Sequence, residues 1–73
     1  MTLDKSKKGM LVKILDIPDQ LVRAQIIRFG ITAGATVTCE EIVPGGPVIV
    51  SRNRQEIAIG RSLASQIKIE PVA

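Results

Sequence analysis

The side chains that most often perform acid–base or nucleophilic chemistry are nearly absent from this sequence. Its 73 residues include no His, no Trp, no Tyr and a single Cys. Without His, neither a Ser-His-Asp triad nor imidazole acid–base catalysis can be built. Cys39, without a second Cys or a His, cannot form a structural zinc site. We therefore expect no catalytic or metal-ligating residue, and a protein that acts by binding.

The sequence also lacks a paired-carboxylate site and the common nucleotide-binding motifs. Glu40 and Glu41 are adjacent, but neighbours on a strand point to opposite faces, so they do not make a paired-carboxylate site. The chain contains neither a P-loop pattern nor GxGxxG, which removes the common nucleotide sites, and we expect no cofactor. Cys39 alternates in step with Val37, which predicts a buried structural thiol. A redox or metal-sensing role for Cys39 is the alternative.

The charge and aromatic content bear on the class of partner. Ten Lys and Arg stand against seven Asp and Glu, a net charge of +3 that is typical of a solvated surface. Proteins that read single-stranded nucleic acid stack bases on aromatic side chains, and grooves for proline-rich peptides are lined with them. Phe29 is the only aromatic residue here. We expect a protein partner and no nucleic-acid partner.

One amphipathic helix is predicted over about residues 18–29. Three apolar residues recur at the spacing i, i+4 and i+7 and should face the core: Val22, Ile26 and Phe29. Asp16 or Asp19 would cap its start, and the sequence does not decide between them. Gly30 is expected to end it in the left-handed conformation.

The same helix carries a second, looser apolar stripe. A small barrel that wraps the helix would bury this stripe as core. Otherwise the stripe is an exposed patch between two arginines that docks on a partner. Both alternatives stay open, and the second defines the candidate partner-binding residues, to which two arginines of a predicted hairpin tip are added: Leu21, Arg23, Ala24, Ile27, Arg28, Arg52 and Arg54.

Outside the helix, the sequence reads as five short strands joined by turns. Apolar residues alternate over residues 9–15, 35–43 and 67–70, and on both sides of the polar tip within 47–59. The sequence PGGP at residues 44–47 is a turn. These features predict a mainly β protein, a small antiparallel β-barrel. One α-helix is inserted between its first two strands, and a short 3-10 or helical turn is expected near residues 61–66.

Length and hydropathy suggest one domain over residues 1–73. No run approaches the roughly 18 apolar residues of a membrane span. The N-terminus lacks the apolar core of a signal peptide, and a lone Cys is compatible with a reducing compartment. We expect a cytoplasmic protein that meets a membrane only through its partner.

The order of several weak motifs resembles the FeoA family. The matching runs are IIRFGITAGATVTC at 26–39, VPGGPVIV at 43–50 and EIAIGRSLASQIKIE at 56–70. They correspond to a helix stop, a strand, a Pro-x-x-Pro turn, an apolar-Ala-apolar strand and a closing Ile-x-Ile. The likeness extends from Gly9 to Glu70. Two departures are Asn53-Arg54, where many relatives place Gly, and Gln25, where a basic residue is common.

The resemblance implies an SH3-like barrel with an extra helix and a cytoplasmic accessory of the ferrous iron transporter FeoB. Such a protein would support or regulate iron uptake without being an enzyme. The same fold occurs as the C-terminal domain of iron-dependent repressors, so a regulatory protein-interaction module with weak self-association is one alternative. A small nucleic-acid-binding barrel is the other. No DNA-binding segment precedes the match, which favours the transporter accessory.

Overall fold

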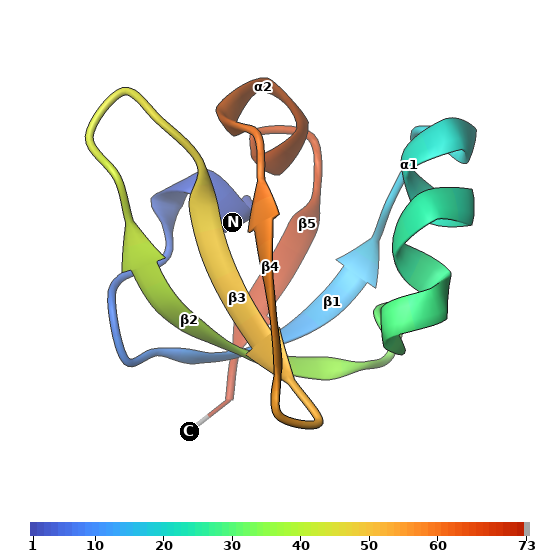
Figure 1. The fold of residues 1–73 in the computed structure, drawn as a ribbon, viewed down its shortest axis with the longest axis horizontal. Coiled ribbons are helices and arrows are strands. Elements are labelled where there is room, and N and C mark those ends of the chain that lie inside the picture. The colour runs from blue at the N-terminus through green and yellow to red at the C-terminus, as the bar shows by residue number, and fades with distance from the viewer. Residues whose placement is uncertain (73) are drawn as a thin grey trace.

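The computed structural model describes residues 1–72 and contains five antiparallel strands in one curved sheet (Figure 1). The order of strands across the sheet is β4-β3-β2-β1-β5. Their bounds are β1 Leu11–Asp16, β2 Thr36–Ile42, β3 Val48–Arg52, β4 Gln55–Ile59 and β5 Lys68–Pro71. The predicted mainly β, SH3-like architecture is confirmed. Its two edge strands, β4 and β5, do not pair with each other within residues 1–72, so the barrel is open.

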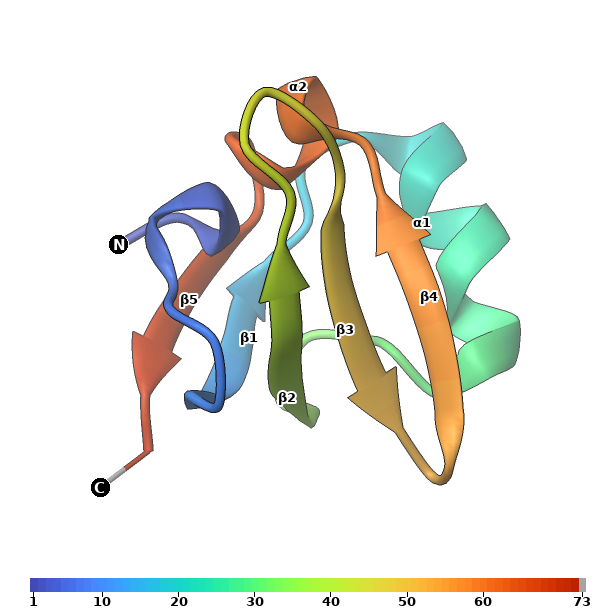
Figure 2. The same cartoon turned by 60° about the vertical axis from the view of Figure 1, so that its left-hand side comes forward.

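Four short helical segments complete the described chain. They are the 3-10 turns η1 Leu3–Lys5 and η2 Ile27–Phe29 and the helices α1 Gln20–Ile26 and α2 Arg61–Ala64. The helix expected at 18–29 thus begins two residues later, and its last turn tightens to 3-10 geometry. The turn expected near 61–66 is a single α-helical turn. In Figure 2, α1 stands at the side of the sheet where β4 forms the edge.

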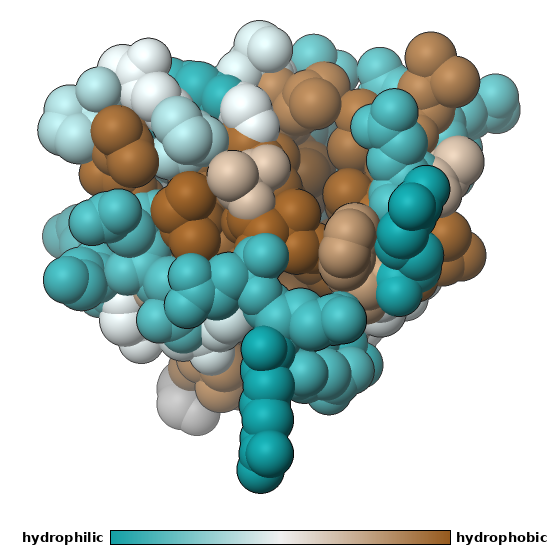
Figure 3. Space-filling model, in the orientation of Figure 1, coloured by the Kyte–Doolittle hydropathy of each residue, from teal (hydrophilic) through white to brown (hydrophobic). Residues whose placement is uncertain are grey.

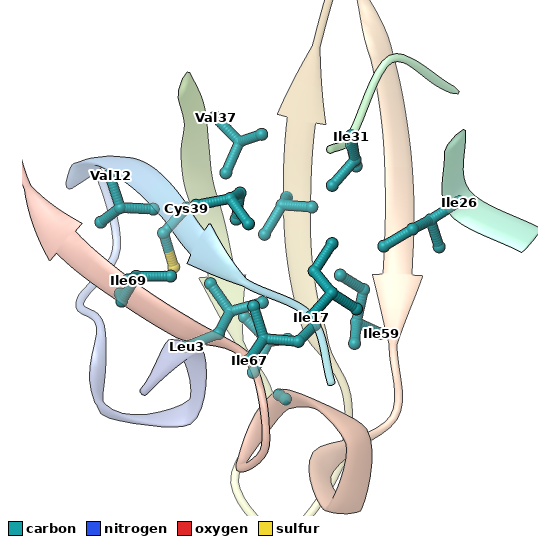
Figure 4. Close-up of a cluster of buried hydrophobic side chains, with 14 of the residues drawn as sticks. Leu3, Val12, Ile17, Ile26, Ile31, Val37, Cys39, Ile59, Ile67 and Ile69 are labelled. Carbon is teal, nitrogen blue, oxygen red and sulfur yellow. The ribbon is translucent and has the colours of Figure 1, made fainter. Parts of the chain in front are cut away.

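Strand alternation produces the core. Inward-facing residues of all five strands are buried: Val12, Ile14, Val37, Cys39, Val48, Val50, Ile59 and Ile69. Figure 4 shows Val12, Val37, Cys39, Ile59 and Ile69 among the side chains that fill the inside of the curved sheet. The expected burial of Cys39 is confirmed, since its exposed fraction is 0%. Ile57 of β4 is only half-buried because β4 has no neighbouring strand on its outer side within residues 1–72.

The first residues of the chain cover the β5 edge. Thr2 forms an isolated antiparallel bridge with Lys68. The Leu3 N–H donates to the Ile67 carbonyl at 2.9 Å, and the Ile69 N–H donates to the Met1 carbonyl at 2.8 Å. The Leu3 side chain is fully buried. The N-terminal segment is therefore part of the fold, and one edge of the sheet has backbone partners.

Candidate functional site

The start of α1 is fixed by Asp19. Its Oδ1 accepts hydrogen bonds from the backbone N–H groups of Leu21 at 2.9 Å and Val22 at 3.1 Å. A helix leaves its first N–H groups without partners inside the helix, and a side-chain oxygen satisfies them. Asp19, and not Asp16, is therefore the cap that the sequence left undecided.

The end of the helical segment is fixed by Gly30. Its φ is +78°, a left-handed conformation that strongly favours glycine. The Gly30 N–H donates to the Ile27 carbonyl at 2.9 Å, and the Ile31 N–H donates to the Ile26 carbonyl at 3.4 Å. Ile26 and Ile31 are both buried, as expected for this stop motif. With both ends fixed, the side of the helix that faces the core is fixed as well.

The outer face of α1 and η2 carries the second apolar stripe. Leu21 is 76% exposed, Ile27 is 58% exposed, and Ala24 between them is also exposed. Val22 and Ile26, on the opposite side, are 6% and 7% exposed. The stripe is therefore not core, because α1 covers the open side of the sheet and no described segment covers α1. We call Leu21, Ala24 and Ile27 the helix patch.

Two arginines flank the helix patch on the same helical segment. Arg23 and Arg28 are both exposed. Residues four apart in a helix are neighbours on its surface, and this spacing relates Arg23 to Ile27 and Arg28 to Ala24. The structure therefore brings together all five candidate residues of the helix on its solvent side.

The β3–β4 hairpin tip has the geometry of a two-residue loop. Asn53 has φ +52° and Arg54 has φ +67°, while Arg52 pairs with Gln55 at the base of the loop. Two successive positive φ values are typical of a type I′ turn, which matches the twist of the strands. Asn53 suits this conformation, whereas Arg54 occupies a position that favours glycine. The Arg54 side chain is exposed.

Arg52, the other candidate at the tip, is mainly engaged inside the fold. It is half-buried, and its Nη1 donates to the Thr36 carbonyl at 2.9 Å. A Cβ built on Gly30 would lie 3.1 Å from Arg52 Nε, so this side chain abuts the end of the helical segment. Arg52 thus joins the hairpin to the helix stop. In Figure 1 the helical segment ends in the lower half of the view, where the tip of the β3–β4 hairpin also lies.

Arg61 has a structural role that the sequence did not reveal. Its Nε donates to the Gly46 carbonyl at 3.1 Å and its Nη2 donates to the Val43 carbonyl at 2.9 Å. The side chain therefore ties α2 to the loop between β2 and β3. No local pattern predicts this contact, because its partners are 15 and 18 residues away.

Two searches of the described residues concern other kinds of site. Across residues 1–72, no three side chains of His, Cys, Asp or Glu are grouped so that they could hold a metal ion. None of the helices in that range has the length and apolar character needed to cross a membrane.

Comparisons with known proteins identify relatives. The model of the FeoA domain family matches residues 1–71. A crystal structure of an iron uptake regulatory protein (FeoA) is 27% identical, covers 99% of this chain and 97% of its own, and superposes with a TM-score of 0.86. The solution structure of FeoA from Chlorobium tepidum is 24% identical and covers 100% and 71%, with a TM-score of 0.89. No match was found among the curated proteins.

A third solved structure extends the fold similarity. The FeoA-like protein from Clostridium acetobutylicum is 23% identical, covers 100% of this chain and 87% of its own, and has a TM-score of 0.79. At this identity the likeness concerns the fold. The family model spans almost the whole sequence, and the open barrel with its inserted helix is the fold of these structures: the chain belongs to the FeoA family.

Proposed function

We propose that this protein binds the cytoplasmic part of a FeoB-type ferrous iron transporter through the helix patch, and that it supports or regulates iron uptake from the cytoplasm without catalysing a reaction. Membership of the FeoA family implies an accessory role in ferrous iron transport. The observation that carries the proposal is the exposure of Leu21 and Ile27, at 76% and 58%. Large apolar side chains gathered on one face mark surfaces that bind other proteins.

The surroundings of the helix patch support a protein partner. Arg23, Arg28 and Arg54 are exposed on the helix and on the neighbouring hairpin tip. Arginine is enriched in protein interfaces, and a few residues near the centre of an interface contribute most of the affinity. Burying one Leu or Ile side chain contributes about 1.5–3 kcal/mol. Two such residues suit a moderate, reversible contact of the kind a regulatory accessory needs.

The direct test is a binding titration with the purified cytoplasmic domain of the transporter. It is run with GDP and with a GTP analogue, because the family resemblance implies a transporter with a cytoplasmic GTP-binding domain, and at two salt concentrations. Ile27→Glu should weaken binding at least about tenfold, because a charge replaces an apolar side chain at the centre of the contact. Gln66→Glu is the matched control, since it makes the same charge change at an exposed residue outside the patch.

Folding of the Ile27→Glu variant is checked by its thermal unfolding. Because Ile27 is 58% exposed, we expect its stability to change by no more than about 0.5 kcal/mol. Absence of binding in both nucleotide states would overturn the proposed partner. Equal binding by the unaltered protein and Ile27→Glu would instead remove the helix patch from the contact. If the affinities of the unaltered protein and of Gln66→Glu both fall steeply as the salt concentration rises, the association is electrostatic and does not depend on the apolar patch.

A further inference from the structure

The two edges of the sheet differ in their backbone partners. The β5 edge is covered by the N-terminal segment, and β5 ends at Pro71, which has no N–H to offer. The β4 edge pairs with β3 on one side, and no backbone hydrogen bond of the described residues reaches it from the other side. An open edge strand is a template for another extended chain.

The register of the hairpin identifies which groups are free on β4. In antiparallel strands, residues alternate between pairs that exchange hydrogen bonds and pairs that do not, and the pair that closes a two-residue loop exchanges them. Arg52 and Gln55 close this loop, so Gln55, Ile57 and Ile59 bond to β3. The N–H and C=O groups of Glu56 and Ala58 therefore point to the open edge. Both residues are exposed.

A hydrophobic groove runs along this edge. Figure 3 shows apolar atoms in the hollow between the region of β4 and that of α1, with polar atoms around it. Three half-buried apolar side chains come from the elements that border this hollow: Ile57 of β4, Leu63 of α2 and Phe29 of η2. Figure 4 shows Ile26 pointing from α1 toward the β4 side, where Ile59 lies. An added strand could place alternate apolar side chains over this surface.

The charges around the groove indicate the composition of the segment that fits. Arg54, one residue before β4, is exposed, and Arg61, two residues after β4, is half-buried. Glu56 is the one exposed carboxylate on β4, and Asp19 is engaged by the helix cap. The two ends of β4 thus carry positive charge against the single carboxylate of Glu56, which attracts acidic side chains at the ends of an added strand and disfavours basic ones.

We propose that an extended segment of a partner protein adds to the free edge of β4 as a sixth strand, with apolar residues at alternate positions and carboxylates at its ends. Main-chain hydrogen bonds to Glu56 and Ala58 give the affinity, and the groove selects the side chains, as in other cases of strand addition. This surface lies between β4 and α1, whereas the helix patch faces away from the sheet. The proposal does not depend on the transporter contact.

A peptide selection on the full chain tests the proposal. A phage-displayed library of random peptides of about ten residues, long enough for one strand with flanks, is panned on the protein. Enriched peptides should alternate apolar residues and carry Asp or Glu. Ala58→Pro should lower the affinity for synthetic copies of these peptides at least about tenfold, because the variant lacks one outward N–H and the proline ring occupies the edge. Ala58→Val keeps the N–H and should bind within about twofold.

Two further measurements test the β4 edge without relying on the Ala58→Pro variant. In the unaltered protein, the amide protons of Glu56 and Ala58 should exchange more slowly once peptide is bound, and this holds even if Ala58→Pro fails to fold. Leu21→Ser, which removes an apolar side chain from the helix patch, should leave peptide affinity unchanged. The proposal is overturned if no peptide is enriched, if enriched peptides are basic, if Ala58→Pro binds them normally, or if exchange at both amides is unaltered.

Discussion

At the level of single residues, the two residues of the hairpin tip differ in how well they suit its backbone conformation: Asn53 suits it and Arg54 does not. Asn53 and Arg54 both have positive φ, at +52° and +67°. Asparagine enters this region readily, but for most other residues it costs about 1–2 kcal/mol. Arg54 therefore reduces stability slightly, and its exposed guanidinium is available for a partner.

Replacing Arg54 should reveal the cost of this conformation. Arg54→Gly should raise the free energy of unfolding by about 0.5–1 kcal/mol, since glycine removes the strain but loses more chain entropy on folding. Arg54→Ala is the control, because it removes the same charge and keeps the Cβ. Urea unfolding of both variants measures the difference. Equal stabilities of the two would contradict the assignment of strain to the Cβ.

At the level of elements, the stability of α1 depends on the residues at its two ends. A helix of seven residues followed by one 3-10 turn is too short to be stable alone in water. Its stability comes from burial of Val22 and Ile26, the Asp19 cap and the Gly30 stop. Because the helix patch lies on this short element, the caps also keep the patch in place.

Removal of the cap should weaken the whole fold measurably. Asp19→Ala leaves two N–H groups without their side-chain acceptor and should lower the free energy of unfolding by about 1 kcal/mol. Asp16→Ala, a change of the same kind at the exposed end of β1, should cost less than about 0.5 kcal/mol. Chemical denaturation compares them. A larger loss for Asp16→Ala would show that the sequence is capped differently in solution.

At the level of the whole molecule, the sheet is open, and its two edges differ in the segments that lie against them. The N-terminal segment covers β5 and buries Leu3 completely, so residues far apart in sequence close the core. α1 stands beside the other edge without bonding to it. A chain of this size has only a modest core, so each closing contact is a large part of its stability.

The contribution of the N-terminal segment can be measured at Leu3. Leu3→Ala should lower the free energy of unfolding by about 2–5 kcal/mol, because it leaves a cavity at a fully buried position. Lys5→Ala in the same segment is the control and should be nearly neutral, as the Lys5 side chain is exposed. A loss near zero for Leu3→Ala would mean that the segment is detached from the sheet in solution.

The sequence by itself determined the features that depend on neighbouring residues. Strand alternation predicted the buried Cys39, the sequence PGGP predicted the turn between β2 and β3, and Gly30 predicted the left-handed stop. Each of these follows from the conformational preferences of a few adjacent residues or from the repeat of a strand. The order of such motifs was also enough to indicate the family.

Only the tertiary structure decided which surfaces are free. The apolar character of Leu21 and Ile27 is compatible with a buried stripe and with an exposed patch. They are exposed because no long-range contact of the described residues covers this face of α1. Arg52 and Arg61 have the same charge as Arg54, yet they bond to carbonyl groups of distant loops and strands. The edge of β4 is open because, within residues 1–72, only β3 pairs with β4, whereas the N-terminal segment pairs with β5. Exposure and edge pairing are properties of the packed chain, since they depend on contacts between residues far apart in sequence.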